Sequence, residues 1–95
     1  MRIYEVIDLP LHEQVFEFLR LNRLISNRAD FSRNYLGRSR SYLNTIQYSG
    51  HLPSTDAMTV LSERLEWLVG TDITEGTKTE VLLYKTKIDH ILNSR

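Results

Sequence analysis

The feature that most constrains the fold of this chain is the spacing of its apolar residues. In several short segments they recur at intervals of three and four residues, which is the repeat of one face of an α-helix. The first segment starts at Pro10, runs to about residue 25 and carries Leu11, Val15 and Phe18 on one stripe. Because capping residues and glycines separate the segments, the sequence predicts several short helices and an all-α fold.

Four further helices are expected, at roughly 28–35, 40–48, 55–69 and 78–93. The residues expected at their ends are the caps Asp8, Ser26 or Asn27, Ser39, and Ser54 or Thr55, and the breakers Gly37, Gly50 and Gly70. The stretch "EVLLYKT" at 80–86 also fits a strand, but its apolar stripe continues at helical spacing through Ile88 and Ile91, which favours a helix.

A length of 95 residues predicts a single domain, with a core of helices over 10–70 and an extra helix over 77–94. The chain contains no cysteine, which excludes disulfides and thiolate chemistry. The opening "MRIYEVIDLPLHEQ" has no long apolar run, so we expect neither a signal peptide nor a membrane-spanning segment. A cytoplasmic location is the default expectation.

The formal net charge is zero, but the charges are unevenly distributed. Residues 1–19 carry one arginine against four acids, a net charge of −3. Residues 20–51 carry six arginines against Asp30, a net charge of +5, and residues 52–95 carry five bases against seven acids, a net charge of −2. A local basic patch of this kind indicates nucleic-acid binding. Arginines that merely coat solvated helix faces would give the same distribution.

Residues that could support catalysis or metal binding are scattered. His12, His51 and His90 have no partner at a metal-ligand spacing, and Glu63 with Glu66 lies on a helix that has the character of a surface. The chain has no glycine-rich phosphate loop and no nucleophile elbow. We therefore expect no enzyme activity, no metal site and no cofactor.

Residues 28–47 show a more specific arrangement. Two short helical segments are separated by about four residues that include Gly37, which permits the left-handed backbone of a tight turn. Ser32 is small where the two helices must approach, and Leu43 and Ile46 would bury the inner face of the second helix. This arrangement is typical of a helix-turn-helix, whose first helix crosses the DNA backbone while the second lies in the major groove.

Over residues 26–69 the chain resembles the lambda repressor–Cro group of helix-turn-helix proteins. The matching positions are Phe31, Ser32, Leu36, Gly37, Ser39, Leu43, Ile46, Gly50, Pro53, Ser54, Ala57, Leu61 and Leu65. Arg38 stands where that group usually has a buried valine or similar residue, and Gln47 replaces a frequent glutamate. The resemblance implies a four- to five-helix lambda-repressor-like domain, here with an extra C-terminal helix.

The resemblance also implies a function, that of a sequence-specific, DNA-binding transcriptional regulator from a bacterial or phage setting. Its partner would be double-stranded DNA. The residues placed to read base edges are Arg40, Ser41, Asn44 and Thr45, and those placed to contact phosphate are Arg28, Arg38, Tyr48 and His51. Arginine can form two hydrogen bonds with guanine, and asparagine can form two with adenine.

Two questions stay open at the level of sequence. The C-terminal stripe of Val81, Tyr84, Ile88 and Ile91 either covers the domain's own core or forms the two-fold interface of a homodimer, since such regulators commonly bind paired half-sites. The second question is whether this fold serves as a protein-interaction module without DNA binding. Arginines neutralised by nearby acids would favour that alternative, and a continuous positive face around residues 40–48 would favour DNA.

Overall fold

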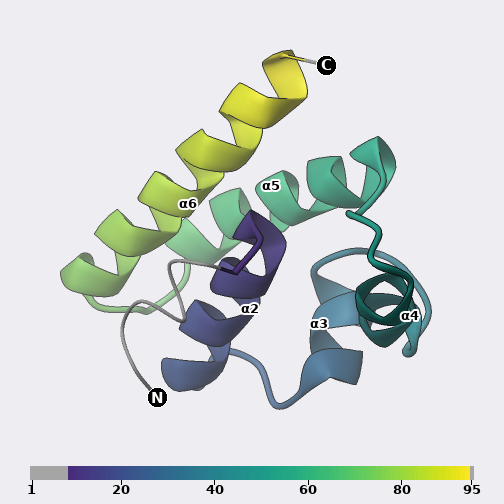
Figure 1. Ribbon diagram of the computed structural model, residues 1–95. Helices are drawn as coiled ribbons and strands as arrows, with labels where there is room; N and C mark the ends of the chain where they lie inside the picture. Colours follow the sequence, from purple (N-terminus) through teal and green to yellow (C-terminus); the bar gives the residue numbers. More distant parts are fainter. Residues whose placement is uncertain (1–8, 95) are drawn as a thin grey trace.

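A computed structural model describes residues 9–94, and the regular structure within that range is entirely helical (Figure 1). The helices are α2 at Leu11–Leu21, α3 at Arg28–Asn34, α4 at Tyr42–Ser49, α5 at Thr55–Val69 and α6 at Glu75–Asn93. The predicted all-α fold is thus confirmed for this part of the chain, and the expected cap Asp8 lies outside it. Among these five helices, none is both long and apolar enough to cross a membrane.

Two helices begin where the sequence places their caps, because capping depends on neighbouring residues. The Asn27 side chain accepts a hydrogen bond from the backbone N–H of Asp30 at 2.9 Å, at the start of α3. Ser54 accepts one from the N–H of Ala57 at 3.2 Å, at the start of α5. Each bond satisfies a backbone donor that has no partner within the helix.

The first helix is shorter than predicted, ending at Leu21 rather than near residue 25. Arg23 has a φ of 58°, and the backbone N–H of Leu24 donates to the carbonyl of Leu19 at 2.9 Å, which closes the helix end. Ile25 nevertheless turns back into the core, where it is 7% exposed. Ile25 therefore fits the apolar spacing of the helix although it lies beyond the helix end, which is why the predicted helix was too long.

The last helix is longer than predicted, since it begins at Glu75 instead of about 78. Thr74 caps it, and its hydroxyl accepts a hydrogen bond from the N–H of Thr77 at 3.2 Å. The segment that also fitted a strand, residues 80–86, lies within this helix.

All five helices contribute to one core. The largest fully buried side chains are Val15, Leu19, Phe31, Leu36, Leu43, Leu61, Leu65, Val81 and Ile88, together with the small Ser32. Phe31 meets the edge of Phe16 at 5.6 Å between ring centroids and stacks on Tyr35 at 5.9 Å. The contact with Phe16 anchors α3 to α2 by burying large apolar surfaces.

The C-terminal stripe belongs to this core, which answers the first open question for most of its residues. α5 and α6 form the most extensive helix pair, and Val81 and Ile88 are completely buried in the domain. Tyr84 packs on Phe18 at 5.2 Å, and Ile91 is half-buried. Val81 and Ile88 therefore cannot form a homodimer interface, because the domain buries them completely, whereas a homodimer through the partly exposed Tyr84 and Ile91 stays a prediction.

α3 and α4 form the second packed pair, on the side of the molecule away from α6 (Figure 1). This separation leaves the outer surfaces of α3 and α4 uncovered by the long C-terminal helix.

Candidate nucleic-acid interface

The connection between α3 and α4 depends on a glycine. Gly37 has a φ of 64°, a left-handed conformation that residues with a side chain rarely adopt. A Cβ atom at this position would lie 3.3 Å from Cγ1 of Val60 on α5. The chain thus needs glycine here both for the turn and for close contact with α5.

The start of α4 is held by α3. The hydroxyl of the buried Ser32 accepts a hydrogen bond from the backbone N–H of Leu43 at 3.0 Å. The prediction that Ser39 caps this helix is wrong, because the N-cap residue is Ser41. The side chain of Ser41 forms no capping hydrogen bond. Ser39 contributes only its carbonyl, which accepts from the N–H of Tyr42 at 3.1 Å. Ser32 supplies the bond that a local cap would otherwise make.

The outward face of α4 carries two of the four predicted base-reading residues, and a third lies just before the helix. Leu43 and Ile46 are buried, so the helix turns Asn44 and Thr45 towards solvent. Ser41 precedes the helix on the same side, at the spacing of one helical turn. Tyr48 follows one turn later and is 95% exposed. These side chains form one continuous polar surface along the helix.

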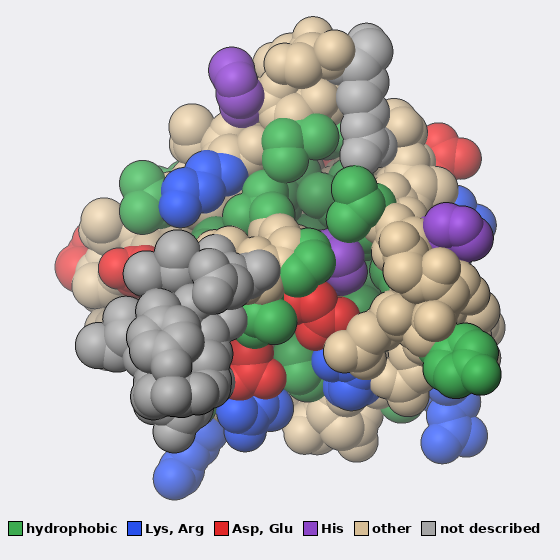
Figure 2. All heavy atoms as spheres, viewed as in Figure 1, with side chains coloured by type: hydrophobic (Ala, Val, Ile, Leu, Met, Phe, Trp, Pro, Cys, Tyr) green, Lys and Arg blue, Asp and Glu red, His purple; other side chains and the backbone are tan. Residues whose placement is uncertain are grey.

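A shallow groove runs between α3 and the beginning of α4, and we call it the arginine groove. Its lining residues are Ala29, Arg33, Arg38, Ser39, Arg40, Ser41 and Asn44. All three arginines are exposed, and none of them takes part in an ion pair within residues 9–94. Several Lys and Arg side chains also lie along the lower edge of the view in Figure 2, where Figure 1 shows α2, α3 and α4.

Arg38 occupies the position where a buried aliphatic residue is expected, and its contacts show how a charged residue fits there. Its guanidinium lies over the Tyr42 ring at 5.6 Å and donates a hydrogen bond to the Ser54 hydroxyl at 2.9 Å. The Tyr42 hydroxyl in turn accepts from the backbone N–H of Ser54 at 3.0 Å. Arg38 therefore lies at the surface and joins the start of α5 to α4, and its charge needs no burial.

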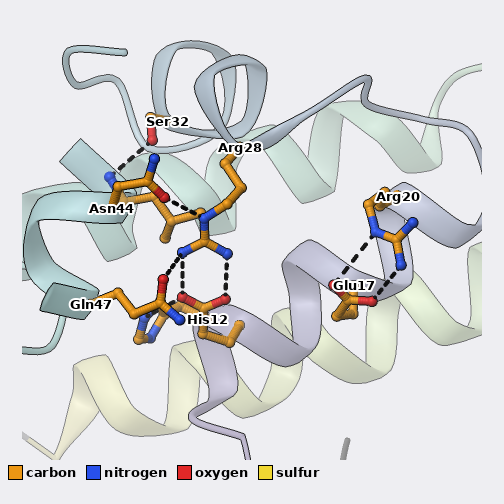
Figure 3. A network of polar contacts seen from close by, with 9 residues as sticks. His12, Glu17, Arg20, Arg28, Ser32, Asn44 and Gln47 are labelled. Carbon is orange, nitrogen blue, oxygen red and sulfur yellow. Dashed lines mark hydrogen bonds and ion pairs between the residues drawn. The ribbon is translucent and has the colours of Figure 1, made fainter. Parts of the chain in front are cut away.

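Arg28 has a different environment from the groove arginines (Figure 3). Its two terminal nitrogens donate to the two oxygens of Glu13 on α2, both at 2.9 Å. Its Nε donates to Oδ1 of Asn44, and Nη2 also donates to Oε1 of Gln47 at 2.9 Å. The Glu13 side chain is only 8% exposed and that of Arg28 26%. One guanidinium therefore links α2, α3 and α4.

His12 lies beside this network, with its Nε2 atom 3.7 Å from Oε2 of Glu13. Burial lowers the pKa of His12 below its ordinary value of 6.5; the carboxylate of Glu13 opposes this shift, and the nearby charge of Arg28 adds to it. The imidazole is therefore neutral at pH 7. Within residues 9–94 no three His, Asp or Glu side chains are grouped as a metal site requires.

The sequence matches the model of a family of unknown function, DUF6626, over residues 12–89. The chain belongs to this family. The matched region extends from α2 into α6 and so includes the arginine groove and the Arg28 network. Neither the curated proteins nor the solved structures gave a significant match.

In this DUF6626 domain, the tertiary structure groups the predicted site residues differently from the sequence. The arginine groove brings Arg38, Arg40, Ser41 and Asn44 together, and Thr45 and Tyr48 continue its polar surface along α4. Arg28 has its donors engaged inside the domain, and His51 follows the far end of α4. Arg33, which sequence reasoning left out of its site residues, lines the groove because it lies one turn after Ala29 on α3.

Glu13 was also absent from the predicted site. The sequence feature that could have indicated Glu13 is its position three residues before the buried Phe16, which places it on the inner face of α2. An acid on an inner face requires a buried partner.

Proposed function

We propose that this protein is a DNA-binding regulator of the lambda repressor–Cro type, with α3 and α4 as its helix-turn-helix and α4 in the major groove. The observation that carries the proposal is the arginine groove beside the exposed polar face of α4. Three arginines that form no ion pair within residues 9–94 lie next to Ser41, Asn44 and Thr45, and together they offer phosphate contacts and base contacts on one surface.

The proposed contacts follow from where each side chain lies. Arg40, Ser41, Asn44 and Thr45 meet base edges, because they occupy the start and the outward face of α4. Arg33, Arg38 and Tyr48 meet phosphates on either side. Arg33 replaces Arg28 in this role, since Glu13 already neutralises Arg28. A pair of protomers on paired half-sites is compatible with this arrangement through a surface other than the buried Val81 and Ile88 of α6.

The first test is binding of the wild-type protein to random-sequence duplex DNA across a salt series. Each lost phosphate contact reduces the slope of log affinity against log salt by about one. We therefore expect the Arg33→Ala, Arg38→Ala double variant to bind more weakly, with a slope smaller by about two.

The matched control is the Arg20→Ala, Lys87→Ala double variant, which also removes two positive charges but lies outside the groove. Its affinity and slope should stay close to those of the wild type. The proposal fails if the wild type binds no duplex at low salt, or if the two double variants behave alike.

The second candidate function, a protein-interaction module on the same fold, also has a specific observation in its favour. Two arginines of the basic segment are neutralised by acids of α2, Arg28 by Glu13 and Arg20 by Glu17 at 2.8 Å. In addition, Trp67 is 54% exposed on α5, as an aromatic anchor for a protein partner would be. Folded protein that binds no duplex at low salt would favour this function.

A further inference from the structure

Asn44 lies between the arginine groove and the Arg28 network, and it belongs to both. Its side chain lines the groove beside Arg38 and Arg40. Its amide oxygen accepts a hydrogen bond from Nε of Arg28 (Figure 3). An arginine nitrogen can only donate, so the atom that faces it must be the oxygen of the amide, and the orientation of the amide is decided by chemistry.

Arg28, which donates to the Asn44 oxygen, is itself fixed in place by other contacts. The two nitrogens at the end of the Arg28 guanidinium form parallel bonds of 2.9 Å to the buried carboxylate of Glu13, a geometry that fixes the plane of the fork. Nη2 also bonds to the oxygen of Gln47, and the guanidinium lies 5.1 Å from the centre of the Phe16 ring. Arg28 cannot turn away from Asn44 without breaking these contacts.

The amide oxygen of Asn44 therefore faces Arg28, and no hydrogen bond engages its NH₂ group within residues 9–94. Recognition of adenine by asparagine uses both ends of the amide, the oxygen to accept from N6 and the nitrogen to donate to N7. Guanine presents two acceptors, O6 and N7, in the major groove, thymine presents O4, and adenine presents N7 beside its N6 donor. Cytosine presents a donor at the same edge.

We infer that Asn44 donates from its NH₂ group to an acceptor on the base edge, and so discriminates against cytosine, which presents a donor there. This inference rests on the proposed function, and it names the class of base that the site takes. Arg38 and Arg40 beside it carry only donors as well, so this end of α4 is matched to an edge rich in acceptors.

The test is selection of bound sequences from a random duplex pool with the wild type, Asn44→Ala and Asn44→Asp. The position that loses its preference in Asn44→Ala is the one that Asn44 reads. At that position the wild type should deplete cytosine about fivefold or more relative to the other three bases, as expected for one well-formed hydrogen bond.

Asn44→Asp makes the sharper comparison, because aspartate has nearly the same shape and can still accept from Arg28. Its second oxygen then presents an acceptor to the groove, so the preference at that position should change towards cytosine. The control is Gln47→Glu, which makes the same chemical change beside Arg28 but outside the groove. It should leave this position unchanged.

Cytosine enriched at the Asn44-dependent position in the wild type, or no gain of cytosine in Asn44→Asp, would overturn the inference and leave the proposed function intact. If the wild-type protein selects no duplex at all, the proposed function itself fails and the inference fails with it. Thermal unfolding of each variant confirms that the compared proteins are folded.

Discussion

Arg28 is the residue whose surroundings say most about how the helices are held. It forms an ion pair with a carboxylate that water scarcely reaches, and it serves two side-chain amides of α4 at the same time. An ion pair of this kind contributes little net stability, because both charges lose hydration on folding. Loss of one partner is expensive, since the other charge then stays in a poorly hydrated place without compensation.

The first stability prediction concerns this pair. Arg28→Met should lower the free energy of unfolding by about 3 kcal/mol, because it leaves the buried Glu13 carboxylate without a partner. The double variant Glu13→Gln, Arg28→Met should recover part of that loss, since no unpaired charge remains. Urea denaturation of the purified variants measures both values.

Arg20→Met is the matched control, because Arg20 also pairs with a glutamate of α2 but at the exposed surface. Exposed ion pairs contribute little, so its stability should hardly change. A loss for Arg28→Met no larger than that for Arg20→Met would show that the network is not a buried structural element.

At the scale of elements, the junction of α3 and α4 depends on one glycine and one serine. Gly37 provides the left-handed turn, and Ser32 provides the first hydrogen bond of α4. The sequence indicated both positions, but for Ser32 it indicated only the small size. Its role as an acceptor for Leu43 depends on a contact between helices, which no local pattern contains.

A series of glycine variants tests the junction. Gly37→Ala should destabilise the domain by about 2 kcal/mol, because the left-handed conformation and the approach of Val60 both oppose a side chain. Gly50→Ala should cost about 1 kcal/mol, since its φ is 73° but the space around it is open. Urea denaturation compares the two values.

Gly76→Ala is the control for that series. Gly76 lies in the first turn of α6 with no atoms near a new Cβ and no positive φ. Alanine there should stabilise the protein by about 0.5 kcal/mol, because it favours the helix more than glycine does. If Gly37→Ala costs no more than Gly50→Ala, the contact with Val60 has no energetic role.

At the scale of the whole molecule, the zero net charge conceals two kinds of arginine. Arg20 and Arg28 are neutralised by acids of α2, whereas Arg33, Arg38 and Arg40 line one groove without an ion pair in the described part of the chain. The charge that a nucleic acid would encounter is therefore that of the groove. The count over residues 20–51 located the basic segment, and the fold decided which of its charges are available.

The same packing makes the stability of the whole domain depend on pH. The pKa of His12 is lower in the folded protein than its ordinary value of 6.5, so the unfolded chain takes up this proton first as the pH falls. The contribution of neutral His12 to the stability of the fold is fully present above pH 6.5. It is lost as the pH falls towards the pKa of His12 in the folded protein. We expect stability to decrease from pH 7 downwards, at no more than about 1.4 kcal/mol per pH unit from this group.

The measurement is urea denaturation at a series of pH values for the wild type, His12→Gln and His51→Gln. His12→Gln should remove much of the decrease just below pH 6.5, whatever its effect on absolute stability. His51 is exposed, and its replacement should leave the dependence in place. Equal pH profiles for His12→Gln and the wild type would contradict the prediction.

The sequence by itself determined the features that depend on near neighbours. Apolar spacing predicted all five helices, and the caps Asn27 and Ser54 placed two helix starts, because a helix and its cap are made within a few residues. The end of α2 was misplaced for a related reason. Ile25 is buried by a turn of the chain, and apolar spacing does not distinguish that from a longer helix.

Only the tertiary structure decided the composition of the candidate site. Glu13 and Arg28 are 15 residues apart, and Arg28 and Asn44 are 16 apart, so their contacts arise from the packing of α2, α3 and α4. That packing pairs Arg28 with a buried acid, brings Arg33 to the groove and buries Val81 and Ile88 of α6. Exposure and pairing depend on which helices meet, and a one-dimensional pattern of residue types does not contain that information.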